Sequence, residues 1–218
     1  MIKKKFFKFD ESINLSLKKI MKTHPNVFYF GLGADDSARV FNTTNRLKEL
    51  YGSYRVFDTP LSENAMTGVA VGMSLNGKIP IMSHQRLDFF LLAMDQLVNS
   101  ASKWNFMFGK QNKINMVIRL IVGRGWGQGP THSQNLQSWF AHIPGLKVMA
   151  PSFPSTASSI IEQSINDKNP TIIIENRWCH QLKESLNSFK KNKKKIKYGK
   201  SIKLNSGKDL TVVTSSYS

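Results

Sequence analysis

Asp58-Thr-Pro-Leu-Ser-Glu63-Asn-Ala-Met-Thr-Gly68-Val-Ala-Val-Gly72 is the stretch from which the architecture can be worked out. An extended run, Tyr54-Arg-Val-Phe57, enters it through a turn at Pro60, and Ser62 is suited to cap a helix of small apolar residues. Glu63 then falls in the first helical turn, where the helix dipole favours a carboxylate. Its apolar neighbours predict a desolvated carboxyl group with a raised pKa, suited to sharing a proton. The alternative is an ordinary helix-start residue.

Strand-like and helix-like patterns alternate along the whole chain. The apolar run from Ile114 to Val122, interrupted only by Asn115 and Arg119, is typical of a strand buried on both faces of a parallel sheet. The pattern predicts an α/β fold, a doubly wound and mostly parallel sheet with helices on both faces. We expect strands at 27–30, 55–57, 79–82, 114–122, 146–149 and 171–175, and helices at 11–23, 45–51, 63–76, 88–108, 132–140 and 155–166.

Three of the expected strands are followed by residues that could form a site. Glu63, the segment before Phe89 and the glycine-rich loop before His132 each come directly after a strand. Ligands of doubly wound sheets bind outside the carboxyl ends of the strands, so these three positions are expected to converge.

Composition narrows the class of protein. The 218 residues are 40% hydrophobic, enough for a folded α/β domain, and no apolar run reaches the roughly 20 residues of a membrane span. The basic start, Met1 to Lys8, lacks the apolar core of a secretory signal. The single cysteine, Cys179, excludes an internal disulfide, is expected to be an inert thiol and fits a reducing, cytoplasmic location.

The net charge of +17 is concentrated at the two ends of the chain. The basic run towards the C-terminus is rich in Lys, with Asn and Ser and few aromatics, so it is interpreted as a solvated linker, and nucleic-acid binding is disfavoured. We therefore predict a domain at 1–182, a lysine-rich linker at 183–208, and at 209–218 the first strand of a truncated or missing C-terminal domain.

A continuous set of motifs between roughly residues 50 and 178 resembles one enzyme family. The chain is similar to the β subunit of the decarboxylating component of 2-oxo acid dehydrogenase complexes, above all the pyruvate dehydrogenase type, and more broadly to the pyrimidine-binding domain of the transketolase superfamily. The motifs are Asp58-Thr-Pro-Leu-Ser-Glu63, Gly68-Val-Ala-Val-Gly72, Ala93-Met-Asp95-Gln96-Leu-Val-Asn99-Ser-Ala101, Gly129-Pro-Thr-His132-Ser133-Gln134, Trp139-Phe-Ala-His142-Ile-Pro144-Gly145-Leu-Lys-Val148 and Asn169-Pro170-Thr-Ile-Ile-Ile-Glu175-Asn176.

The resemblance implies thiamine diphosphate as cofactor and assigns roles to matched residues. Glu63 would hydrogen-bond the ring nitrogen of the aminopyrimidine, so that the cofactor's own amino group becomes basic. Phe89 would pack on that ring, with Leu61 also lining the cofactor, and His132 would face the substrate and the acyl acceptor. His142, beside Pro144 and Gly145, is expected to satisfy a buried backbone group.

Further expectations concern a metal ion and the points at which this chain departs from the family. Met116, Ser164, Asp167 and Asn169 match positions at which some members hold a potassium ion by carbonyl oxygens. Gly31-Leu-Gly-Ala-Asp-Asp36 replaces a Gly-Glu-Glu motif, and Ser83-His84-Gln-Arg86-Leu replaces an aromatic approach to Phe89. His84 and Arg86 are therefore expected to alter which oxo acid is accepted.

The chain lacks the Gly-Asp-Gly and paired-asparagine signature that binds diphosphate and Mg²⁺. The resemblance therefore implies a shared site, with an α-type partner holding Mg²⁺ in a hetero-oligomer such as a heterotetramer. The expected function is oxidative decarboxylation of a pyruvate-like 2-oxo acid, with acyl transfer to a lipoyl group and a lipoyl acyltransferase as a further partner. Two alternatives stay open: a split transketolase or deoxyxylulose-phosphate-synthase-like transferase, and a scaffold subunit without turnover.

Overall fold

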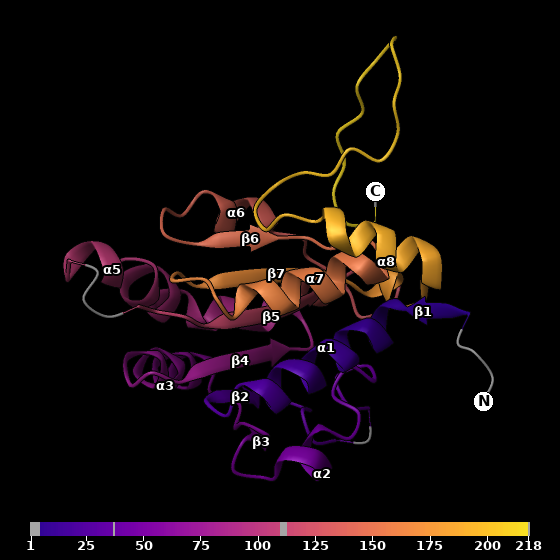
Figure 1. The fold of residues 1–218 in the computed structure, drawn as a ribbon. Helices are drawn as coiled ribbons and strands as arrows, with labels where there is room; N and C mark the ends of the chain where they lie inside the picture. The colour runs from indigo at the N-terminus through magenta and orange to yellow at the C-terminus, as the bar shows by residue number, and fades with distance from the viewer. Residues whose placement is uncertain (1–4, 37, 110–112, 218) are drawn as a thin grey trace.

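The computed structural model describes residues 5–36, 38–109 and 113–217 and contains a six-stranded, wholly parallel sheet (Figure 1). All five neighbouring strand pairs are parallel, which confirms the predicted α/β class. Across the sheet the strands are β3 (Val56–Phe57), β2 (Val27–Phe30), β4 (Ile79–His84), β5 (Val117–Val122), β7 (Thr171–Asn176) and β6 (Lys147–Met149).

Helices cover both faces of this sheet. Strand side chains alternate between the faces, so Ile81 and Val117 contribute to one core cluster while their neighbours Met82 and Ile118 contribute to the other. The first cluster packs against α1 (Phe9–Thr23) and α7 (Pro154–Ser164), and the second against α3 (Glu63–Leu75) and the helical segment after β4. Two dry cores on opposite faces are the reason that the strands read as continuous apolar runs.

The helix expected at 88–108 is helical but not one regular α-helix. It is built from α4 (Leu87–Phe90), the 3₁₀ turn η1 (Leu91–Ala93), the π-helical η2 (Gln96–Ala101) and α5 (Trp104–Met107). Each change between α, 3₁₀ and π winding alters the number of residues per turn, so the apolar side chains do not stay on the face that a regular α-helix would give them. Leu92 is 69% exposed, whereas its neighbours Phe90 and Ala93 are buried. Shorter elements complete the domain: α2 (Leu47–Tyr51), η3 (Pro130–His132), α6 (Gln137–Ala141) and η4 (Arg177–Gln181).

The prediction of a linker at 183–208 is wrong for residues 183–195, which form regular secondary structure. Residues 183–185 form β8 (Lys183–Ser185), which pairs antiparallel with β1 (Phe6–Lys8), and α8 (Leu186–Lys195) follows directly. The Ser185 side chain caps α8 by accepting a hydrogen bond from the backbone N–H of Ser188, and Phe189 stacks on Phe7 with centroids 4.3 Å apart. Lysine is a good helix former, so a lysine-rich run with one aromatic anchor can be helical.

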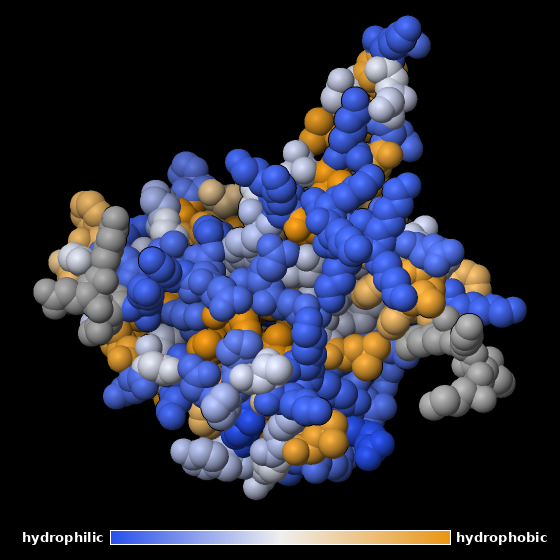
Figure 2. Space-filling model, viewed as in Figure 1, coloured by the Kyte–Doolittle hydropathy of each residue, from blue (hydrophilic) through white to orange (hydrophobic). Residues whose placement is uncertain are grey.

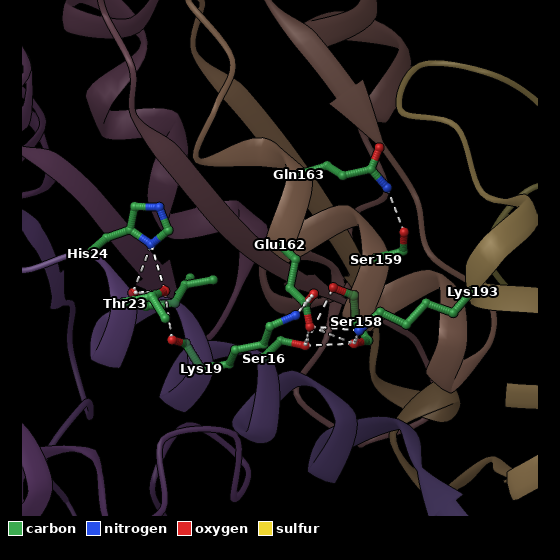
Figure 3. A network of polar contacts seen from close by, with 10 residues as sticks. Ser16, Lys19, Thr23, His24, Ser158, Ser159, Glu162, Gln163 and Lys193 are labelled. Carbon is green, nitrogen blue, oxygen red and sulfur yellow. Dashed lines mark hydrogen bonds and ion pairs between the residues drawn. The ribbon is translucent and has the colours of Figure 1, made fainter. Parts of the chain in front are cut away.

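A polar network joins α8 to α1 and α7 (Figure 3). Glu162 of α7 accepts hydrogen bonds from Lys193 of α8 at 2.7 Å and from Lys19 of α1 at 2.7 Å. The two lysines and their hydrogen bonds outweigh the burial of Glu162, which acts in the opposite direction, and hold the pKa of this carboxyl below its usual value. The hydroxyl groups of Ser16 and Ser158 lie 2.7 Å apart beside it. The network fastens residues 183–195 to the domain.

Just after α8, Ile196 is buried and Tyr198 packs against the core of the domain. The chain then rises as a loop away from the body of the domain (Figure 1), and residues 215–217 return to line a pocket together with Gly123 and Trp178. The strand expected at 209–218 is not formed over residues 209–217, which the structure describes, and Leu210, Val212 and Val213 are 73%, 76% and 88% exposed. Hydrophilic residues cover most of the surface around α8 in Figure 2. None of the helices in the described ranges has the length and apolarity that a bilayer crossing requires. The assignment of 209–218 to another domain stays a prediction.

Candidate active site

The three positions that were expected to converge all lie at the carboxyl edge of the sheet. β3 leads to Glu63 at the start of α3, β4 leads to Phe89 in α4, and β5 leads through a glycine-rich loop to His132 at the end of η3. Since β3, β2, β4 and β5 run parallel side by side, their C-terminal loops meet at one edge. The parallel order of these strands therefore places Glu63, Phe89 and His132 at the same edge of the sheet.

Phe89 and His132 are in direct contact. Their rings meet edge to face, with centroids 5.3 Å apart and planes at 88°, and both side chains are half-buried. Imidazole Nδ1 lies 3.1 Å from Thr131 Oγ1. The indole N–H of Trp126 donates to the backbone carbonyl of His132 at 3.0 Å and to Ser133 Oγ at 2.9 Å, so the glycine-rich loop fastens the turn that carries the histidine.

The glycine-rich loop is packed tightly where it leaves β5. Gly123 has φ of +158°, and a Cβ there would lie 3.2 Å from Arg177 Cβ and 3.2 Å from the Trp126 ring. Any larger residue would push the loop away from the end of β7. The glycine therefore allows the loops after β5 and β7 to approach each other.

Glu63 does not lie in a water-poor crevice of this chain alone. It is half-buried, and within the described residues its side chain has no hydrogen bond or ion pair. Ser62 begins the helix only through its backbone, because its carbonyl accepts from Met66 N–H at 2.9 Å while its side chain does not cap the helix. Leu61 beside it is 77% exposed. The chain leaves an unpartnered carboxylate next to an uncovered apolar residue.

His142 differs from its expected role. It follows α6 as an exposed residue, and its backbone N–H donates to Ser138 O at 3.0 Å. Because the residue is exposed, its imidazole does not satisfy a buried backbone group.

The four residues expected to hold potassium lie together at the opposite, N-terminal edge of the sheet. Thr171 N–H donates to Met116 O at 2.9 Å, Asp167 N–H donates to Ser164 O at 3.1 Å, and Asn169 N–H donates to Asp167 Oδ1 at 3.0 Å. Lys147 forms an ion pair with the Asp167 carboxylate. Across the residues that the structure describes, no group of three or more His, Cys, Asp or Glu side chains could hold a metal.

Oxygen atoms without partners lie close to these four residues. Asn105 Oδ1 and Asn115 Oδ1 are buried and lack a hydrogen-bond partner, while Asn105 Nδ2 donates to Asn169 Oδ1 at 3.0 Å and Asn115 Nδ2 donates to Ile165 O. Neutral oxygens of this kind fit a weakly held monovalent cation better than a transition metal.

A buried ion pair inside the sheet was missed by the sequence analysis. Arg119 of β5 donates to both carboxylate oxygens of Glu175 of β7, at 2.6 and 2.8 Å, and to Tyr29 OH at 2.7 Å, and both charged side chains are fully buried. Burial alone would raise the pKa of Glu175, but the Arg119 charge outweighs it and holds the pKa at about 2. The available signal was one arginine and one glutamate in otherwise apolar strands.

His84, at the end of β4, is a second buried polar group near this edge. It is 6% exposed, its ring lies 4.9 Å from that of Phe90, and its Nε2 lacks a hydrogen-bond partner. Burial lowers the pKa of His84 to about 4, so the imidazole is neutral at pH 7.

Comparison with known families and structures gives a consistent picture. Residues 7–179 match the family model described as "Transketolase, pyrimidine binding domain". A solved structure described as "Split gene transketolase, inactive beta4 tetramer" superposes with a TM-score of 0.62 at 20% identity, covering 78% of this chain and 51% of that one. At this level of identity the structural match supports the fold alone.

Curated relatives are named as β subunits of the pyruvate dehydrogenase E1 component. The chain is 32% identical over 204 residues to that of Staurastrum punctulatum, covering 94% of this chain and 61% of the relative. It is 32% identical over 209 residues to mitochondrial beta-1 of Arabidopsis thaliana, covering 94% and 56%, and 35% identical over 176 residues to chloroplastic beta-4 of Oryza sativa subsp. japonica, covering 81% and 44%. The chain spans about half the length of the curated relatives it matches.

Proposed function

Because this chain belongs to the transketolase pyrimidine-binding domain family, we propose that it supplies the pyrimidine side of a thiamine diphosphate site. The proposed reaction is oxidative decarboxylation of a pyruvate-like 2-oxo acid, with the acyl group passed to a lipoyl acceptor. The observation that carries it is the edge-to-face contact of Phe89 with His132 at the carboxyl edge of the sheet, where α3 also begins with Glu63.

The residues present fit the cofactor. An unpartnered, half-exposed carboxylate at Glu63 is free to hydrogen-bond a ring nitrogen, and the Phe89 ring offers an apolar surface for a heteroaromatic ring. When bound, thiamine diphosphate supplies the nucleophilic carbon that the side chains of this chain lack. His132, held from behind by Trp126, would orient the substrate and exchange a proton with it at an imidazole nitrogen.

An α-type partner completes the proposed site. Glu63 needs a dry surrounding to share a proton, and this chain leaves it half-exposed. Leu61, in the loop before α3, and Val69 of α3 are 77% and 49% exposed, and Ala65, four residues before Val69 on the same helix, is also exposed, so apolar surface beside Glu63 is available for a partner. The partner would cover Glu63 and hold the diphosphate and Mg²⁺, in a hetero-oligomer that we propose to be a heterotetramer.

Three further parts of the assignment are also proposals. A potassium ion would be held by carbonyl oxygens of Met116, Ser164, Asp167 and Asn169, since Lys147 already neutralises the Asp167 carboxylate. A lipoyl acyltransferase would receive the acyl group. A cytoplasmic location is supported by a single, buried cysteine, although several relatives are named as mitochondrial or chloroplastic.

Reconstitution tests the proposed function. The chain is co-expressed with an α-type partner, and decarboxylation of a 2-oxo acid is followed with an artificial electron acceptor. Activity is expected only when both chains, thiamine diphosphate and Mg²⁺ are present. The isolated chain should bind the cofactor weakly, so tight Mg²⁺-dependent binding by it alone counts against a shared site. A folded, assembled complex without turnover would instead support the scaffold alternative.

A further inference from the structure

Two arginines share one aromatic ring at the carboxyl edge of the sheet. Arg177 Cζ lies 4.4 Å from the centroid of Phe41, and Arg86 Cζ lies 5.6 Å from the same centroid and 4.1 Å from that of Trp126. We call these four residues the arginine–aromatic cluster. They come from the loops after β2, β4, β5 and β7, and all four side chains are half-buried.

The positive charges of the arginine–aromatic cluster are not neutralised by ion pairs. Arg86 donates to Gln128 Oε1 from Nε at 3.1 Å and from Nη2 at 2.6 Å, and to Gln85 O from Nη1 at 2.6 Å. All three acceptors are uncharged, and a guanidinium has five N–H donors, so two remain for a ligand. In the described part of the chain neither Arg86 nor Arg177 forms an ion pair with a carboxylate.

The nearest acidic groups act at longer range. Burial and the charge of Arg177 lower the pKa of Arg86, while Asp88 acts in the opposite direction. Burial lowers the pKa of Arg177, opposed by Asp10. Two cations that lie close together in a partly desolvated site repel each other, which makes the site less stable. An anion bound between them would remove this repulsion.

Backbone strain supports a role beyond packing. Arg39, Val40, Phe41 and Asn42 have φ values of 49°, 44°, 56° and 69°, a left-handed turn of four consecutive residues that are not glycine. Left-handed backbone costs roughly 1–2 kcal/mol for each such residue. This turn brings Phe41 under the two guanidinium groups. Strain that the surrounding structure maintains in this way is characteristic of functional sites.

The arginine–aromatic cluster adjoins the candidate active site. The Trp126 ring lies beside the Arg86 guanidinium, and its indole N–H is bonded to the backbone carbonyl of His132. One indole ring therefore separates the arginine from the residue that contacts Phe89. An anion bound by the arginines would belong to the far end of a molecule whose reacting end lies at His132.

We propose that Arg86 and Arg177 bind an oxyanion, a carboxylate or phosphate at the end of the substrate remote from the reacting carbon. The guanidinium groups match both oxyanions in geometry and charge. The binding of the anion stands on the cluster alone. Its assignment to the substrate rests on the proposed function, and it narrows the substrate to an oxo acid or acceptor that carries a second negative group.

The first test uses the isolated 218-residue chain. Inorganic phosphate and succinate are titrated separately at constant ionic strength, which keeps nonspecific attraction to the net charge of +17 constant. Binding is followed by calorimetry and by tryptophan fluorescence. Saturable binding of at least one anion is expected, with a fluorescence change that Trp126→Phe removes. Phosphate binding more tightly than succinate assigns a phosphorylated group, and the reverse assigns a dicarboxylic oxo acid.

Matched variants decide whether the site is the proposed one. Arg86→Gln and Arg177→Gln should each weaken binding at least tenfold, whereas Lys191→Gln, which removes one charge from exposed α8, should change it less than twofold. Arg177→Lys keeps the charge and controls for folding, and it should weaken binding by an intermediate factor because the guanidinium fork is lost. Equal weakening by Lys191→Gln, no effect of either arginine variant, or no saturable binding overturns the proposal.

The reconstituted enzyme gives the second test. Arg177→Gln should raise KM for an oxo acid with a second negative group and leave KM unchanged for one with an uncharged side chain. Equal KM changes for both substrates overturn the substrate assignment. An assembled enzyme without turnover refutes the proposed function but leaves the anion titration valid, so the two failures are distinguishable.

Discussion

The imidazole of His132 meets the ring of Phe89 edge to face, with centroids 5.3 Å apart, although the two residues belong to helical turns that follow different strands. The contact follows from β4 and β5 being neighbours in a parallel sheet. It joins an aromatic surface to a proton-exchanging group at a single point. Glu63 begins α3, which packs against η1 and η2, the segments that follow Phe89.

His132→Gln should slow acyl transfer without weakening cofactor binding. Glutamine keeps a polar group of similar reach but cannot exchange a proton near neutral pH, so acyl transfer should fall about 10²–10⁴-fold. Cofactor affinity should stay within a few fold, because the backbone carbonyl still accepts from Trp126. Single-turnover assays with a lipoyl acceptor, alongside cofactor titration, measure both. Equal loss of affinity and transfer would contradict the assigned role.

Glu175→Gln should destabilise the fold by roughly 3–5 kcal/mol, because it leaves the Arg119 charge buried without its counter-ion. The control is Glu49→Gln, whose ion pair with Arg39 lies nearer the surface and should cost less than about 1 kcal/mol. Urea unfolding measures both. The stabilisation by Glu175 is present above pH 4.5 and is lost as the pH falls towards 2, since its pKa is lowered in the folded chain. A loss below 1 kcal/mol would contradict this account.

His84 should make the fold acid-sensitive in a different range. Its pKa is lowered from 6.5 to about 4, so the unfolded chain binds a proton there before the folded one does. The stability that the neutral imidazole provides is full above pH 6.5 and falls as the pH drops to 4, by about 3 kcal/mol. His84→Leu should remove that dependence. Unfolding free energies measured at pH 7, 5.5 and 4 compare the two chains, and parallel curves would refute the prediction.

Truncation tests whether β8 and α8 belong to the domain. A chain ending at residue 182 loses the pairing of β8 with β1 and the ion pair of Lys193 with Glu162, and it should melt at least 5 °C lower. A chain ending at residue 200 keeps both, and its Tm should match that of the full chain within 2 °C. Equal melting temperatures for the two truncated chains would support the originally predicted linker.

Much of the fold could be predicted from the sequence because, in its core, the spacing of the apolar residues agrees with the residues that begin and end each element. Val27–Phe30 was expected as a strand and is one, and the helix expected at 63–76 runs from Glu63 to Leu75. A strand that is buried on both faces of the sheet needs apolar residues at successive positions, so it is seen in the sequence as an unbroken apolar run. At 91–101 the same reasoning failed, since a period of 3.6 residues does not describe a helix that changes to 3₁₀ and π winding.

The site was predictable only in part. Motif positions located Phe89 and His132, whose contact follows from strand order. The environment of Glu63 depends on what covers Leu61 and α3, and this chain holds no information about a partner's surface. The arginine–aromatic cluster depends on a left-handed turn at 39–42, and a turn built from Arg, Val, Phe and Asn has no sequence signal comparable to glycine.

The most direct test of the central claim is turnover of Glu63→Gln in the complex with the α-type partner, against Glu49→Gln as a matched carboxyl-to-amide control. The account predicts at least a 100-fold loss of turnover for Glu63→Gln, with assembly, melting temperature and the Glu49→Gln enzyme close to the unmodified complex. Turnover within a few fold of the unmodified enzyme would contradict it, because no proton could then pass through position 63.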